Sequence, residues 1–183
     1  MNRPPLGLAA TALAAVLIGL TAWLWAGRDN DSPTASSNPA GDSHIEGPAP
    51  ADAEASTAVQ MGLAAMFSWQ PRTDVAPGAA LTRAAPWLSG DLAAASDAPA
   101  TGQAPPEWAR WRDSNDIVAA LVETGPTQSE EKTAIAATVT QRVLHRDGST
   151  TLYRRLHVTV TVTKTLQGWR MANYRINSVT GHG

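Results

Sequence analysis

The residues that could carry chemistry are few and lie apart in the sequence. His157 is the best placed histidine, because it falls in a threonine-rich stretch where polar and apolar residues alternate. No carboxylate is predicted beside it, no second histidine stands at the spacing of a metal site, and Glu130 and Glu131 are predicted to lie in a loop. Phosphate-binding glycine loops, G-x-S-x-G, H-E-x-x-H and cysteine are all absent. We therefore predict a protein that is not an enzyme, with no catalytic residue, cofactor or metal site.

Two sets of side chains are candidates for binding instead. The first set is basic and is predicted on the polar face of a sheet, where it would attract an anionic partner: Arg142, Arg155 and Arg170. The modest number of bases, without exposed aromatic residues between them, argues against nucleic acid. The second set is aromatic and is a candidate for lining a pocket between helices and sheet: Trp69, Trp87, Trp108 and Tyr174.

Such a pocket would also need buried polar groups, for which Tyr174, Asp116 and Asn173 are the candidates. Trp and Arg alternate between Trp108 and Arg112, which is also typical of nucleic-acid or glycan sites. We favour the simpler interpretation, in which two indoles close one end of a core and the arginines face solvent.

The elements that must position these residues are first helical and then extended. Val59, Leu63, Met66 and Phe67 recur on one helical face, and the proline after Gln70 disfavours further helix. The predicted helices are 53–67, 77–85 and a short 92–95. We expect 96–106 to form a loop and 105–112 to form a turn.

From Asp116 onward the apolar period changes to two, which predicts strands over 117–122, 132–144, 151–165 and 169–179. Asp147-Gly148 predicts a two-residue type I′ turn between the second and third strands. This turn pairs Val143 with Leu152 and Val139 with Leu156 on an apolar face, and Arg142 with Tyr153 on a polar face.

The turn between the third and fourth strands is predicted as a three-residue loop that ends on a left-handed Gly168. The resulting pairs are Ala172 with Val162, Tyr174 with Val160, and Ile176 with Val158. Helices followed by strands predict an α+β domain, in which N-terminal helices pack on a curved sheet of four antiparallel strands.

The N-terminal region is predicted to be a membrane anchor. Residues 6–26 carry no charged side chain, are long enough as a helix to span the ~30 Å hydrocarbon core, and end with Trp23 and Trp25. Because the run is longer than a signal-peptide core and lacks a small-x-small cleavage site, we favour an uncleaved anchor over 1–26. Residues 27–52 are predicted to be a disordered linker and 53–183 a soluble domain.

The charge pattern suggests where the domain lies and how it associates. Arg3 on one side of the apolar run, against Arg28 diluted by acids on the other, favours a single-pass cell-membrane protein with a cytoplasmic N-terminus and an extracytoplasmic C-terminal domain. Acids outnumber bases from 53 to 131, and bases outnumber acids from 132 to 183. We favour complementarity within one domain, with head-to-tail self-association as the alternative.

Short motifs in this chain resemble those of actinobacterial single-span membrane proteins with an NTF2-like domain. The motifs are Phe67-Ser68-Trp69 followed by Asp74, Arg83-Ala84-Ala85-Pro86-Trp87-Leu88, Pro106-Glu107-Trp108, and the threonine-rich strand 158–165. Two groups share this layout: the VirB8-like and TcpC-like proteins of conjugative type IV secretion, and the Mce-associated membrane proteins. The resemblance transfers no catalytic role to any residue.

The resemblance implies an NTF2-like cone and a non-enzymatic assembly component of an envelope-spanning conjugative transfer apparatus. Its partners would be other membrane or channel components, with self-association. One alternative is an Mce-associated accessory protein of lipid transport. Another, of a different class, is an NTF2-like enzyme or small-ligand binder that uses a pocket between helices and sheet.

Overall fold

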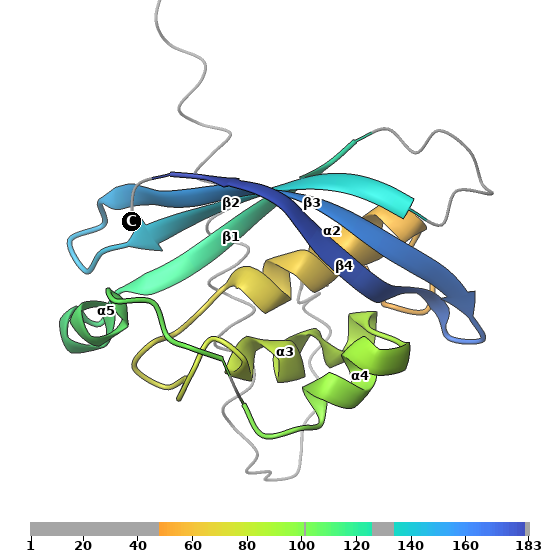
Figure 1. The fold of residues 1–183 in the computed structure, drawn as a ribbon, viewed down its shortest axis with the longest axis horizontal. Coiled ribbons are helices and arrows are strands. Elements are labelled where there is room, and N and C mark those ends of the chain that lie inside the picture. The colour runs from red at the N-terminus through yellow and green to blue at the C-terminus, as the bar shows by residue number, and fades with distance from the viewer. Residues whose placement is uncertain (1–47, 101, 126–133, 182–183) are drawn as a thin grey trace, which may run out of the picture. The chain divides into compact units, whose positions relative to one another are not determined.

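The computed structural model describes residues 48–100, 102–125 and 134–181, which form an α+β domain (Figure 1). The described helices are α2 (Ala55–Phe67), α3 (Ala79–Ala84), α4 (Gly90–Ser96) and α5 (Trp108–Ser114), with a 3-10 turn η1 (Ala85–Trp87) after α3. The strands are β1 (Ile117–Thr124), β2 (Ala134–Leu144), β3 (Thr150–Thr165) and β4 (Gly168–Thr180). They pair antiparallel in the order β1-β2-β3-β4, which confirms the predicted α+β class and four-stranded sheet.

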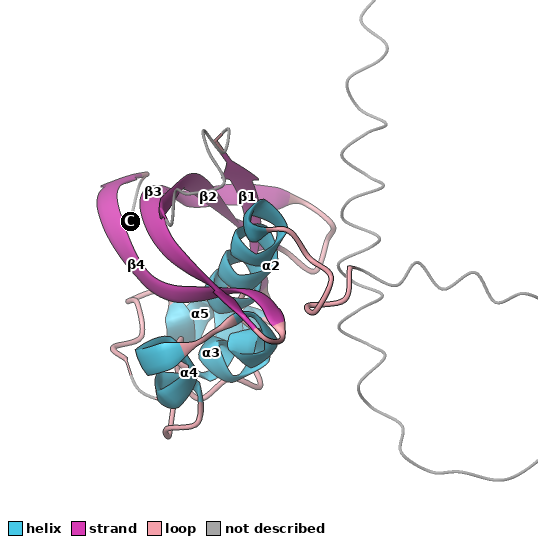
Figure 2. Ribbon diagram, turned by 90° about the vertical axis from the view of Figure 1, so that its right-hand side faces the viewer, coloured by secondary structure: helices cyan, strands magenta, loops and turns pink. Residues whose placement is uncertain are grey.

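The sheet curves around α2, and the other helices lie on the same side of the sheet (Figure 2). The predicted stripe of α2 is buried against the sheet, with Val59 and Leu63 fully enclosed. Gly62 allows close packing on that face, because a Cβ there would collide with the Met171 sulfur and come within 3.3 Å of the Trp87 Cβ. The apolar spacing of α2 therefore fixes which face of the sheet is covered.

Residues 108–114 form helix α5, so the prediction of a turn over 105–112 is wrong. Trp108 and Trp111 are three residues apart, which places both indoles on one helical face, and both are buried. Asn115 takes a left-handed conformation (φ 60°) directly after Ser114, as is common where a helix ends. Burial of two large side chains compensates for a short helix without a side-chain N-cap.

The register of the β2–β3 hairpin matches the prediction away from the turn and departs from it near the turn. Val139 pairs with Leu156 as predicted, but Val143 pairs with Thr151 and Arg142 with Leu152. A β-bulge beside Gln141 absorbs one extra residue, Tyr153. The two-residue Asp147-Gly148 turn is therefore wrong: His145 and Ser149 close a longer loop, with Gly148 left-handed (φ 84°).

The β3–β4 hairpin shows the same kind of correction. Tyr174 pairs with Val160 and Ile176 with Val158, as predicted. The predicted three-residue loop is wrong, because Thr165 pairs with Gly168 and the loop is two residues long, so Met171 instead of Ala172 lies opposite Val162. A bulge at Ala172 then shifts the register by one residue and brings Tyr174 opposite Val160. Gly168 is left-handed (φ 102°), as predicted.

The compact unit begins at Pro48, within the stretch predicted to be a linker. Pro50 and Ala51 pass beside the β3–β4 turn, where their carbonyl oxygens lie so close to Gly168 that no Cβ would fit. The predicted anchor over 6–26 and most of the predicted linker lie outside the described residues. Within the described ranges, no helix combines the length and the apolar character needed to cross a membrane.

Candidate functional site

The four aromatic residues predicted to line a pocket pack into the core instead of surrounding one space. Trp69 and Trp108 are buried with their ring centroids 5.8 Å apart, whereas Trp87 lies in a separate small cluster with Ala53 and Ala58. Tyr174 meets Phe67 edge-on at 6.0 Å. None of the four lines the cavity described below.

Two of the three predicted basic residues lie on the polar face of the sheet, and the third does not. Arg155 is exposed and Arg142 half-buried, and they donate hydrogen bonds to the hydroxyls of Thr140 and Thr150. Arg170 is only 6% exposed, and its guanidinium donates to the Pro50 and Trp169 carbonyl oxygens. Arg170 thus joins the N-terminal segment to β4 and adds little positive charge to the surface.

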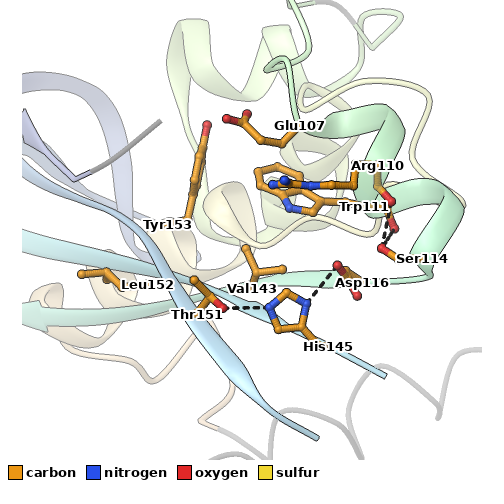
Figure 3. Close-up of a pocket in the computed structure, with 10 residues that line it drawn as sticks. All are labelled: Glu107, Arg110, Trp111, Ser114, Asp116, Val143, His145, Thr151, Leu152 and Tyr153. Atoms are coloured by element: carbon orange, nitrogen blue, oxygen red, sulfur yellow. Dashed lines mark hydrogen bonds and ion pairs between the residues drawn. The ribbon is translucent and has the colours of Figure 1, made fainter. Parts of the chain in front are cut away.

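A cavity of about 600 Å³ opens at one end of the sheet (Figure 3). Of the three polar residues predicted for a pocket, Asp116 lines this cavity, whereas Tyr174 and Asn173 do not. The cavity lies among helix α5, the residue before β1, and the β2–β3 hairpin. Its polar and aromatic lining includes Glu107, Arg110, Trp111, Asp116, His145, Thr151 and Tyr153.

Three of these side chains, Asp116, His145 and Thr151, are linked by hydrogen bonds along the cavity wall. His145 Nδ1 lies 3.0 Å from Asp116 Oδ2, and His145 Nε2 lies 2.8 Å from Thr151 Oγ1. With a neutral ring, Nδ1–H donates to the carboxylate, and Nε2 accepts a hydrogen bond from the threonine hydroxyl. A carboxylate, an imidazole and a hydroxyl in this order can activate the hydroxyl oxygen as a nucleophile. In this structure the two hydrogen bonds hold the plane of the His145 ring.

The β1–β2 register explains why Asp116 and His145 meet. Ile117 pairs with Leu144, so the residue before β1 lies opposite the residue after β2. The sequence contains a signal for this contact, because Asp116 precedes one predicted strand and His145 follows the next. The register of the two strands is needed to show that these residues meet. His157, the best placed histidine by sequence, is exposed on the polar face as predicted, with Nδ1 3.3 Å from the Thr138 hydroxyl.

The bulge at Tyr153 turns its ring toward α5, although the expected register placed Tyr153 on the polar face. The ring meets Trp111 edge-on at 4.9 Å between centroids, and the Arg154 guanidinium carbon lies 5.0 Å from the Tyr153 centroid. Burial raises the pKa of the Tyr153 hydroxyl, and the nearby Glu107 charge also raises it while Arg154 lowers it. Tyr153 therefore stays neutral well above physiological pH.

The Glu107 carboxylate has an unusual environment. Its Oε2 is shielded from solvent, and no hydrogen-bond donor contacts it within the described residues. Figure 3 shows the carboxylate directed toward the hydroxyl end of Tyr153 at the top of the cavity. A shielded carboxylate oxygen without a donor loses hydration without compensation, which favours any cation that enters the cavity. Over the ranges described, no three His, Asp or Glu side chains stand close enough together to hold a metal ion.

A second surface feature is the outer edge of β4. The outer edge of β1 is covered near its start, where Trp69 and Val118 exchange backbone hydrogen bonds of 2.8 and 2.9 Å and the Ala120 N–H donates to the Ser68 hydroxyl. The edge of β4 is covered at Met171, whose carbonyl accepts from Ser89 N at 2.9 Å. Beyond Met171, no described backbone segment pairs with this edge, and residues 175–180 are exposed.

The described residues thus form an α+β domain with a polar and aromatic end cavity and an open edge along the last part of β4. Neither the protein-family models nor the curated proteins compared with this chain give a match.

Proposed function

We propose that this chain is a non-enzymatic component of a membrane-anchored protein assembly, and that its α+β domain binds other proteins through the open edge of β4. The observation that carries the proposal is the last part of β4, where Ile176 (41%) and Val179 (53%) are exposed and no described segment pairs with the outer edge. Residues 68–69 cover the start of β1, whereas Leu88 and Ser89 cover the outer edge of β4 only at Met171. Unpaired backbone groups beside exposed apolar side chains favour pairing with another strand.

The filled interior supports surface binding over binding between helices and sheet. Leu63, Trp111, Val139, Leu156 and Met171 are each at most 2% exposed, and they belong to one continuous core. Side chains therefore occupy the space that a ligand inside an NTF2-like cone would need. This favours an assembly role over the alternative of an NTF2-like enzyme or binder with an internal pocket.

Self-association fits the same edge. Two β4 edges related by a two-fold axis would run antiparallel, and each N–H would face a C=O of the second copy. Arg175 is the only charged residue between 174 and 180, so little like-charge repulsion opposes this pairing. A strand from a different protein would use the same backbone groups.

The finer proposal follows the sequence resemblance. It comprises an NTF2-like cone, an anchor over 6–26, an extracytoplasmic domain, and a role in a conjugative, type IV secretion-like apparatus. An Mce-associated accessory role in lipid transport is the alternative, with the same physical function and a different partner.

Photocrosslinking from intact membranes tests the proposal. A photoreactive phenylalanine analogue replaces Ser178 on the open β4 edge, and a control chain carries it at the exposed Arg72, away from the sheet. We expect discrete protein adducts from position 178 and none from position 72, with Val179→Lys reducing the adducts. Mass spectrometry of the adducts separates channel subunits and coupling ATPases from lipid permeases. Absence of adducts at 178 in a well-expressed chain would contradict the proposal.

A further inference from the structure

The end cavity lies outside the edge-binding role proposed for β4, and its lining has a chemistry of its own. The Glu107 carboxylate and the Asp116 carboxylate both face this cavity, and Asp116 is 6% exposed. The Asp116 carboxylate contacts His145, and this contact is an ion pair only when the His145 ring is protonated. Two carboxylates therefore face the cavity, and a shielded oxygen of Glu107 has no hydrogen-bond donor among the described residues.

Aromatic rings form another wall. Trp111 is 2% exposed and Tyr153 stands perpendicular to it, with an interplanar angle of 86°. The faces of indole and phenol rings attract cations, because their π electrons carry partial negative charge. Carboxylates beside aromatic rings form an environment suited to an ammonium group on an apolar stem.

The Arg154 guanidinium carbon lies 5.0 Å from the Tyr153 ring centroid. Arg110 lines the cavity itself and is exposed. No described side chain forms an ion pair with it. Solvent and salt screen a charge at this position much more than the shielded Glu107 oxygen. Arg110 would therefore weaken cation binding slightly without preventing it.

We propose that this cavity binds a primary ammonium group on an alkyl chain, as carried by a lysine side chain or by a free alkylamine. The ammonium would donate to the Glu107 carboxylate, and its methylene groups would pack on Trp111 and Tyr153. A charge-assisted hydrogen bond would then compensate the shielded carboxylate. The cavity volume of about 600 Å³ accommodates the side chain of a lysine residue whose backbone stays outside.

The test uses the full chain in detergent micelles and ligand-detected NMR titration with small probes. The probes are Nα-acetyl-lysine amide, n-butylammonium, and the neutral Nα-acetyl-norleucine amide. We expect both ammonium probes to bind and the neutral probe to bind at least about tenfold more weakly, since it lacks the charge-assisted hydrogen bond. Lysine probe binding that clearly exceeds n-butylammonium binding would identify a protein side chain as the source, and equal binding would identify free amines.

Variants of single charges sharpen the test. Glu107→Gln keeps the side-chain volume, and we expect it to weaken ammonium binding about tenfold. Asp113→Asn removes the same charge from an exposed position on α5 and should leave binding unchanged. Arg110→Gln should tighten binding about two- to threefold, because it removes a like charge.

Three outcomes would overturn the proposal, provided that thermal unfolding shows the variants to be folded. The first is equal binding of the neutral and ammonium probes, which would make the cavity merely apolar. The second is weaker binding of the ammonium probes in Arg110→Gln, which would show that Arg110 supports binding instead of repelling the cation. The third is no binding of either ammonium probe. None of these outcomes depends on crosslinking at Ser178, so the two proposals can fail independently.

Discussion

His145 in the β2–β3 loop and Asp116 at the start of β1 are joined by a 3.0 Å contact between Nδ1 and Oδ2. The Asp116 side chain is 7% exposed and that of His145 is 31% exposed. The Asp116 backbone N–H also donates to the Trp111 carbonyl oxygen at 2.8 Å. One residue thus connects the end of α5 with the hairpin, and both elements line the cavity.

Removing the Asp116 carboxylate should destabilise the domain. We expect Asp116→Ala to lower the free energy of unfolding by about 1–3 kcal/mol, because His145 and the cavity wall lose a buried acceptor. His145→Gln should cost less, since the ring is partly solvated. Urea unfolding followed by tryptophan fluorescence measures both changes. A double-mutant cycle without coupling between the two positions would show that the contact contributes no stability.

Arg83 should not be replaceable by lysine. Its guanidinium holds Asp74 through two hydrogen bonds, of 2.6 and 2.9 Å, and also donates to the Ser68 carbonyl oxygen. Lysine cannot reproduce this forked geometry, so we expect Arg83→Lys to lower the free energy of unfolding by about 1–2 kcal/mol. Arg72→Lys, at an exposed position, is the control. Equal unfolding midpoints for the two variants would contradict this prediction.

Gly62→Ala should destabilise the domain although alanine favours helix by about 1 kcal/mol. The added methyl would collide with the Met171 sulfur, and Met171 is fully buried. Overpacking of about 1–3 kcal/mol should exceed the gain in helix propensity. The check is a double-mutant cycle with Met171→Ala. The double variant should lose less unfolding free energy than the sum of the losses of the two single variants. A stabilised Gly62→Ala variant would show that Met171 moves aside freely.

Asp147 should contribute a pH-dependent part of the stability of the hairpin. Its carboxylate accepts from the Ser149 hydroxyl at 2.6 Å and the Ser149 N–H at 2.8 Å, and these bonds lower its pKa from the ordinary 3.8. Because the folded pKa is below the unfolded one, the contribution is complete above pH 3.8 and is lost as pH falls through the folded value.

The measurement is the thermal unfolding midpoint at acidic pH. Asp147→Asn should remove part of the acid dependence that the natural chain shows as the pH falls below 3.8. Asp97→Asn, at an exposed position without such bonds in the described structure, serves as the matched control. Parallel curves for the natural chain and Asp147→Asn would refute the prediction.

The sequence by itself determined the secondary structure and the sides of the elements. The stripe of Val59, Leu63 and Met66 and the alternation from Ile135 to Val143 depend on helical and strand periods, which are local properties of the chain. For this reason the helix over α2, the strands and the polar face of the sheet agree with their predictions. The helix α5 was missed because two prolines and two tryptophans indicate a turn until the burial of both indoles is known.

Only the tertiary structure decided the details of register and the site. The longer β2–β3 loop and the bulge at Tyr153 shift the register in opposite directions. The strand pairing at Val139 is therefore the same with both of them as with neither. That pair of compensating changes turned Tyr153 from the polar face to α5. The β1–β2 register then brought Asp116 to His145, and residues 48–52 covered Arg170. Contacts between distant segments depend on how whole elements pack, and no local period of the sequence encodes them.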